Sequence, residues 1–354
     1  MKNILLFLLP IYFFSQNSNT PNLCFGDGTR EYFGKLLVND SEETIVSENP
    51  SHIKFYENKN HISYEEDKKN RYGAPPANEQ TFQKWHNAYE KKYAGFTKYF
   101  GNSFSYIQIQ THKKESFALA ENRFGYWLLE IKNNNPKAYY IGFSKYTHLN
   151  YHQDQPFIKD NILSVSGSFV RNLQAVRYQT IEPVKDFLTF EVPLDEIRKD
   201  SDQDGYNDFF EHLIYLNPYS KDSDQDGISD FFDTNPLYAS ESNKFSNLYE
   251  QIIDGRSENA DNPYNFDVYR SDCEYFQQVN SKKNRVLILN EKQSYQFDEH
   301  YRRDLYPTIY NKIIKDPKDN IFRIPYHTIS SGGEIIAVYE NRQWTITEHQ
   351  TYII

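Results

Sequence analysis

Two stretches of this sequence repeat one acidic pattern: Asp200–Glu211 reads DSDQDGYNDFFE and Asp222–Asp233 reads DSDQDGISDFFD. They start 22 residues apart, and such regularity marks an internal repeat. Acidic residues fill positions 1, 3, 5, 9 and 12 of each stretch, and glycine fills position 6. Calcium loops use this spacing, with carboxylates at 1, 3 and 5, a backbone carbonyl at 7, position 9 directly or through water, and a carboxylate at 12. The sequence therefore predicts two calcium sites.

The alternative interpretation of these stretches is an acidic, solvated linker. A random acidic run would not place a glycine and a Phe-Phe pair at the same positions twice. Without a cation, five carboxylates in each loop would also repel one another strongly. The ten acidic side chains of the two loops equal the net charge of −10, so the acidity belongs largely to this one feature.

Residues 200–236 resemble the thrombospondin type 3-like calcium repeats of bacterial secreted and surface proteins, and the resemblance extends no further. It implies Ca²⁺ as the bound ion and says nothing about activity. The ligands implied in the first stretch are Asp200, Asp202, Asp204, the carbonyl of Tyr206, Asp208 and Glu211. Those implied in the second are Asp222, Asp224, Asp226, the carbonyl of Ile228, Asp230 and Asp233. Aspartate at position 12 is one methylene shorter than glutamate, which predicts a weaker second site.

The first fifteen residues have the features of a secretory signal peptide. Lys2 precedes an apolar stretch of eleven residues, Ile4–Phe14, and a cut is expected after Ser15. The alternatives are a membrane anchor or a buried strand, but the stretch is too short to span a bilayer. We expect export to the periplasm, the cell surface or the medium, with no transmembrane anchor in the mature chain.

Export would permit a disulfide, and the mature chain has two cysteines, Cys24 and Cys273. A bond between them would close a loop of about 250 residues, for which chain entropy predicts roughly 5 kcal/mol of stabilisation. The alternative is two unpaired thiols. We expect the pair to form.

Outward from the repeats, the sequence divides into further parts. Residues 16–77 are polar and are predicted to be irregular, with a strand near Tyr32–Val38. Residues 78–199 are predicted to form a helix plus an antiparallel β domain, because an aromatic stripe at helical spacing is followed by short strands separated by turns. Residues 237–354 are predicted to form a smaller α+β part. The expected class is mainly β with some α, with a β-sandwich-like domain.

These observations predict an exported calcium-binding protein with a structural or adhesive role, in which a calcium clip joins two domains. A glycan or protein at the cell surface is the expected partner, and the negative charge argues against nucleic acid. No catalytic residue is predicted, although a secreted glycan hydrolase with structural calcium and a calcium-dependent carbohydrate-binding protein remain alternatives. His148, His152 and Asp154 have ligand types suited to zinc, but a surface loop is the favoured interpretation.

Overall fold

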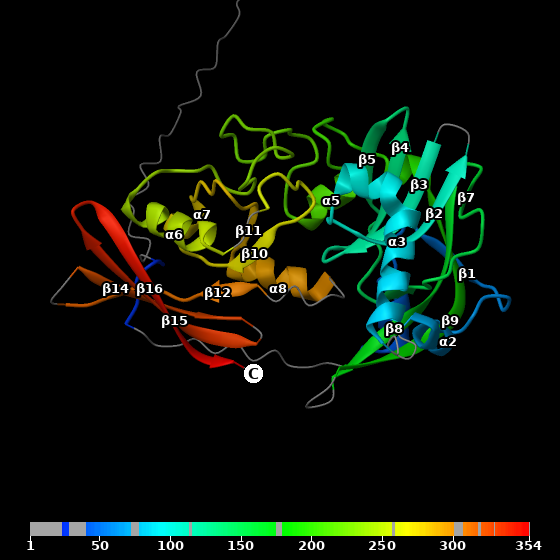
Figure 1. Cartoon of the computed structure of the whole chain (residues 1–354), viewed down its shortest axis with the longest axis horizontal. Helices are drawn as coiled ribbons and strands as arrows, with labels where there is room; N and C mark the ends of the chain where they lie inside the picture. The colour runs from blue at the N-terminus through cyan, green and yellow to red at the C-terminus, as the bar shows by residue number, and fades with distance from the viewer. Residues whose placement is uncertain are drawn as a thin grey trace, which may run out of the picture.

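The computed structural model describes residues 23–27, 40–71, 78–112, 115–174, 179–256, 259–300, 307–317, 320–328 and 330–353. Its architecture is mainly β with some α, as predicted (Figure 1). The predicted signal peptide and the strand predicted near Tyr32–Val38 lie outside the described residues. In the part of the chain described here, no helix is both long and apolar enough to cross a membrane.

Two antiparallel sheets form the N-terminal sandwich, as predicted. The first has the order β2-β3-β4-β5 and consists of β2 (Ser105–His112), β3 (Glu115–Asn122), β4 (Gly125–Lys132) and β5 (Asn135–Tyr140). The second has the order β1-β9-β8-β6, with β7 paired to β8, and consists of β1 (Lys54–Glu57), β6 (Thr147–Leu149), β7 (Ile158–Lys159), β8 (Ile162–Gln174) and β9 (Gln179–Pro193). Residues 175–178, between β8 and β9, lie outside the described part.

Alternate residues of the first sheet enter two different cores. Leu119 and Leu128 point toward the second sheet, where they meet Val165 and Phe190. Their neighbour Leu129 points the other way, into a second core that also contains residues of helix α3 (Glu79–Phe100). Burial on both faces explains why β3 and β4 have runs of consecutive buried residues instead of a simple alternation.

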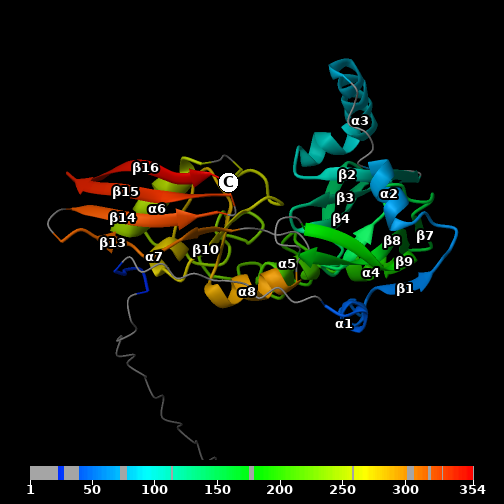
Figure 2. The ribbon, with the colours of Figure 1, turned by 90° about the horizontal axis from the view of Figure 1, so that it is seen from below.

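Helix α3 confirms the predicted aromatic helix, but its stripe is only half buried. Tyr93 and Phe96 pack into the core, whereas Phe82 and Trp85 are 47% and 57% exposed. Figure 2 shows the reason: the N-terminal half of α3 projects beyond the sheet. The first turns of the aromatic stripe therefore lie outside the core.

The prediction of an irregular segment at 16–77 was wrong for residues 40–71. This region contains α1 (Glu42–Ser47), the edge strand β1 and α2 (Tyr64–Arg71). Strand β1 pairs with β9 through its backbone and has mostly exposed side chains, so its sequence has no alternating hydrophobic pattern. Edge strands of this kind leave little trace in a sequence because only backbone pairing defines them.

Residues 200–236 connect the sandwich to the C-terminal part and are named the double-loop segment. Its first loop is Asp200–Glu211 and its second loop is Asp222–Asp233. The short helix α4 (Leu194–Ile197) precedes the segment, and α5 (Asp208–Leu213) begins inside the first loop. In Figure 1 these loops lie between the sandwich and the C-terminal part.

The C-terminal part is α+β, with a single sheet of the order β11-β10-β12-β14-β15-β16, and β13 paired to β14. Its strands are β10 (Asp267–Arg270), β11 (Val286–Leu289), β12 (Thr308–Tyr310), β13 (Ile314–Lys315), β14 (Ile321–His327), β15 (Ser331–Glu340) and β16 (Gln343–Ile353). Strand β10 runs parallel to β11 and β12, and the other pairs are antiparallel. Its helices are α6 (Lys244–Asp254), α7 (Glu274–Gln277) and α8 (Glu291–His300).

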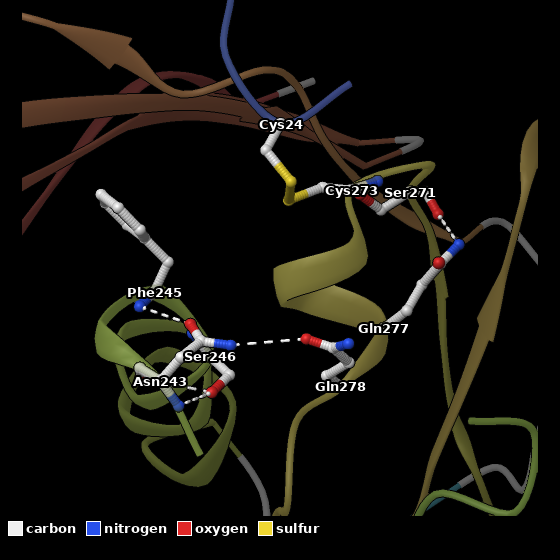
Figure 3. Close-up of a disulfide and its surroundings, with 8 residues drawn as sticks. All are labelled: Cys24, Asn243, Phe245, Ser246, Ser271, Cys273, Gln277 and Gln278. Atoms are coloured by element: carbon white, nitrogen blue, oxygen red, sulfur yellow. Dashed lines mark hydrogen bonds between the residues drawn. A yellow bond between two sulfur atoms is a disulfide. The ribbon is translucent and has the colours of Figure 1, made fainter. Parts of the chain in front are cut away.

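A disulfide joins Cys24 to Cys273, as predicted, with the two Cα atoms 4.4 Å apart. Both cysteines are buried, and Cys273 directly precedes α7 (Figure 3). Backbone hydrogen bonds tie the same N-terminal segment to Ile313, which donates to the carbonyl of Cys24 at 2.7 Å. The bond thus fastens residues 23–27 to the C-terminal part rather than to the sandwich.

Candidate metal centre

The two loops adopt the same backbone turns. Gln203 N donates to Asp200 Oδ1, and Gln225 N donates to Asp222 Oδ1, both at 2.7 Å. Gln203 and Gln225 both have positive φ, at 64° and 66°. Gly205 has φ 127°, a conformation that L-residues with a side chain rarely adopt. The sequence repeat is therefore also a structural repeat.

Carboxylates at positions 1, 3 and 5 converge in each loop. Ligand oxygens within 4.8 Å of one another come from Asp200, Asp202 and Asp204 in the first loop, and from Asp222, Asp224 and Asp226 in the second. Asp202 and Asp224 each use Oδ1 to accept a hydrogen bond from the amide two residues on, at 3.0 and 3.1 Å. Oδ2 of each is buried with no hydrogen-bond partner among the described residues, which is the state expected of an oxygen reserved for a cation.

The carboxylates at position 12 are buried and have oxygens without hydrogen-bond partners among the described residues. Glu211 is fully buried, and neither of its carboxylate oxygens has a hydrogen-bond partner in the described structure. Asp233 is also buried, but its Oδ1 accepts a hydrogen bond from Asn235 N at 2.9 Å, and only Oδ2 is without a partner. A buried, unpaired carboxylate is costly unless it binds a metal. Glu211 can offer two oxygens to a cation and Asp233 one.

Position 9 has a different role in this geometry. Asp208 accepts hydrogen bonds from Ser201 N and Ser201 Oγ, both at 2.8 Å. Asp230 does the same with Ser223, at 2.9 and 2.6 Å. Each carboxylate closes its own loop, so it braces the ligands of positions 1 and 3 whether or not it also reaches the ion. Sequence analysis missed the two serines, although serine occupies position 2 of both repeats.

Position 7 would contribute only a backbone carbonyl, and its side chains differ between the loops. The side chain of Tyr206 is buried, whereas that of Ile228 is 46% exposed. The first loop is therefore the more deeply enclosed of the two.

Burial and mutual repulsion perturb the loop carboxyls strongly. Burial, reinforced by Asp202 and Asp204, raises the pKa of Glu211 to about 9. Burial raises the pKa of Asp204 and of Asp224 to about 7. Burial would also raise the pKa of Asp208, but hydrogen bonds from Lys199 and Ser201 outweigh it and lower that pKa. Glu211, Asp204 and Asp224 thus resist ionisation unless a positive charge arrives.

The first loop is anchored to the sandwich. Asn207 is buried, its Oδ1 accepts from Tyr140 N at 3.1 Å, and its Nδ2 donates to Tyr140 O at 2.9 Å and to Ile197 O at 2.8 Å. The next turn inserts Phe210 against Trp127, with ring centroids 4.7 Å apart. The loop therefore completes the core that α3 and the first sheet share.

The second loop is anchored to the C-terminal part. Buried Arg285 donates from Nη2 to the carbonyl of Asp230 at 3.0 Å and to the hydroxyl of Tyr206 at 3.1 Å. Directly after the loop, Thr234 accepts from Val286 N at 2.7 Å through its backbone carbonyl. Arg285, which directly precedes β11, thereby contacts both loops.

The two loops also contact each other. Phe231 N in the second loop donates to Oδ2 of Asp204 in the first at 3.1 Å, and Lys221 Nζ donates to the carbonyl of Gln203 at 3.2 Å. The Phe231 ring covers Gly205 so closely that a Cβ there would lie 2.8 Å from the ring. A ligand carboxylate of the first loop therefore helps to position the second.

The residues considered for zinc do not come together. His148 is buried on β6, with Nε2 3.0 Å from Oδ2 of Asp67, which corrects the interpretation of this residue as part of a surface loop. His152 and Asp154 are exposed, and Oδ2 of Asp154 lies 3.1 Å from Nδ1 of His61. His148 looked like loop sequence because β6 has only three residues.

Comparisons with known proteins add no family to this picture. No protein-family model matches the chain, and neither the curated proteins nor the solved structures contain a significant match.

Proposed function

We propose that this chain is an exported calcium-binding protein of structural or adhesive role, in which the double-loop segment fastens the sandwich to the C-terminal part. The observation that carries the proposal is Glu211, a fully buried carboxylate with two unpartnered oxygens beside converging aspartates. Acidic clusters on a surface are common without an ion, whereas a buried carboxylate without a partner is rare.

Calcium suits the donor set because all candidate ligands are oxygens. Ca²⁺ takes six to eight oxygen ligands, whereas zinc sites normally include histidine or cysteine. In the first loop the ligands would be Asp200, Asp202, Asp204, the carbonyl of Tyr206 and Glu211, with Asp208 directly or through water. In the second they would be Asp222, Asp224, Asp226, the carbonyl of Ile228 and Asp233, with Asp230 in the same secondary role. The ion would supply the positive charge that this cluster lacks.

A clip role is supported by where each loop is anchored. Asn207 ties the first loop to β5, and Arg285 ties the second to the C-terminal part. The shared core includes Trp127 from the sandwich, Phe210 from the segment and Phe266 from the C-terminal part. Ordering the loops would therefore hold both parts in one arrangement.

Export is supported by two features. The disulfide between Cys24 and Cys273 is typical of oxidising compartments, and the chain begins with a sequence of signal-peptide character. A fusion of residues 1–40 to a reporter that is active only outside the cytoplasm would test it. No reporter activity from the unchanged fusion would contradict export, and activity that persists when Leu5 and Leu6 are both replaced by arginine would contradict the signal-peptide assignment.

Calcium binding is tested by titrating the chelator-treated protein calorimetrically with Ca²⁺ and, in parallel, with Mg²⁺. We expect two calcium ions per chain and much weaker magnesium binding, because Mg²⁺ demands near-octahedral geometry and gives up its water reluctantly. The matched variant is Glu211→Gln, with Glu90→Gln, at an exposed position of α3, as the control. An unchanged titration after Glu211→Gln would refute the first site.

The clip itself is tested by limited proteolysis. Chelator-treated protein should be cut within residues 200–236 and release the two parts, because binding to the folded state stabilises it. Since the disulfide leaves residues 23–27 attached to the C-terminal part, the fragments should be separated under reducing conditions. Equal resistance with calcium and with chelator, in protein that binds calcium, would contradict a clip.

A further inference from the structure

A cleft of about 880 Å³ lies where the sandwich, the double-loop segment and the C-terminal part meet. Its lining comes from the C-terminal end of α3 and the residues after it, the start of β5, the second loop, and residues 259–264 and 282–283. Its volume falls within the range of roughly 300–1,000 Å³ that small-molecule sites occupy. All three parts contribute to it, so it exists only when they are docked.

The chemistry of the lining is aromatic, amide and cationic. Tyr99 and Phe231 are half-buried and line the cleft, and Asn102 and Asn135 bring exposed amides to it. Lys282 and Lys283 are exposed at the same cleft, together with a single acidic residue, Asp261. An aromatic ring presents an apolar face, amides both donate and accept hydrogen bonds, and lysines attract anions.

We propose that this cleft binds an anionic glycan, a short stretch of sugars bearing carboxylate or sulfate groups. The C–H face of a sugar ring packs against an aromatic ring, its hydroxyls pair with amides, and its acidic group pairs with ammonium groups. Nucleic acid fits less well, because a phosphate on every nucleotide needs an extended basic surface and this chain has a net charge of −10. The two neighbouring lysines match a few separate acidic groups.

Glycan binding in this cleft should depend on calcium, an element that rests on the proposed function. Phe231 lines the cleft, and its amide donates to Asp204, a predicted calcium ligand, at 3.1 Å. Its ring centroid lies 5.1 Å from that of Tyr206, which belongs to the first loop. Ordering the loops fixes one wall of the cleft, and by linkage a bound glycan would tighten calcium binding to the same degree.

The test begins with an array of uronic-acid, sulfated and neutral oligosaccharides, probed with the full mature protein in calcium at physiological salt. The strongest ligand is then titrated calorimetrically. We expect anionic sugars to bind, and Lys282→Ala/Lys283→Ala to weaken Kd about tenfold, the loss expected for two exposed charge pairs. Chelation should weaken Kd by about 5- to 150-fold, the usual range of coupling between sites.

The matched control is Lys84→Ala/Lys91→Ala, which removes two exposed lysines of α3 that do not line the cleft and should leave Kd unchanged. No binding on the array, binding confined to neutral sugars, or equal Kd for both double variants would overturn the proposal. Calcium is titrated separately without glycan. Normal calcium binding without glycan binding would refute the glycan site and leave the proposed function standing. If the protein binds calcium but its Kd for the glycan is unchanged by chelator, the coupling between the two sites would be refuted.

Discussion

Replacing Glu211 with glutamine should have opposite effects on stability with and without calcium. The side chain is fully buried and unpartnered, and its pKa is raised to about 9 by burial and by Asp202 and Asp204. At pH 7.5, three units above the ordinary value of 4.5, the metal-free folded state must keep a proton that the unfolded chain has released. Each pH unit between the ordinary pKa and pH 7.5 costs about 1.4 kcal/mol of folding free energy, so retaining this proton destabilises the metal-free protein by at most about 4 kcal/mol.

Glutamine has nearly the same shape and has no proton to retain. In chelator at pH 7.5, Glu211→Gln should therefore raise the free energy of unfolding by up to about 4 kcal/mol, measured by urea denaturation. At pH 5 the gain should fall below about 1 kcal/mol, because pH 5 is only half a unit above the ordinary pKa of 4.5 and keeping the proton then costs little. In saturating calcium the order should reverse, since glutamine supplies one neutral oxygen in place of two charged ones.

Asp233→Asn in the second loop is the matched comparison. The pKa of Asp233 is raised only to about 6, mainly by burial, so its gain in chelator should be at most about 3 kcal/mol. If Glu211→Gln is less stable than the parent in chelator at pH 7.5, the buried carboxylate is not a burden in the metal-free fold. The reasoning that assigns it to a cation would then be refuted.

Three further predictions use the same unfolding measurement. In chelator, the parent's free energy of unfolding should fall as pH rises from about 5 to 9, because carboxyls with raised pKa, Glu211 above all, keep protons in the folded state that the unfolded chain loses. A free energy of unfolding that does not change with pH would contradict this. In calcium, Asp202→Ala should destabilise more than Asp224→Ala, since the first loop has two free oxygens at position 12, and equal losses would show that this ranking fails. Replacing Cys24 and Cys273 with serine should cost up to about 5 kcal/mol, and an unchanged urea midpoint would count against any stabilising role of the bond.

The parts of the fold that could be predicted are those with local patterns. Helix α6 begins with a capping box formed by Asn243 and Ser246. The β15–β16 hairpin turns at Asn341 and Arg342, whose φ angles are 50° and 64°. Strands β6 and β7 could not be predicted, because two or three residues are too few to establish a period. The parallel pairing of β10 likewise depends on distant segments that only the tertiary fold brings together.

In the candidate site, likewise, the ligands could be predicted from a local pattern and the anchoring residues could not. The spacing of the acidic residues predicts which oxygens converge, because a loop of twelve residues fixes its own turns. The residues that anchor the loops, Asn207 and Arg285, could not be predicted. Their partners Tyr140 and Tyr206 are 67 and 79 positions away in sequence, and an asparagine or arginine alone has no distinguishing pattern.

Metal binding and domain docking are difficult to separate in this architecture, because single residues take part in both. The carbonyl of Tyr206 is a predicted calcium ligand, while its buried hydroxyl donates to the carbonyl of Pro263 at 2.5 Å in the C-terminal part. Asp230 braces the second loop with its side chain, and its carbonyl accepts from Arg285. A change that loosens either loop therefore also disturbs the contact between the two parts. A clip built in this way would convert the binding energy of a small ion into rigidity across a much larger interface.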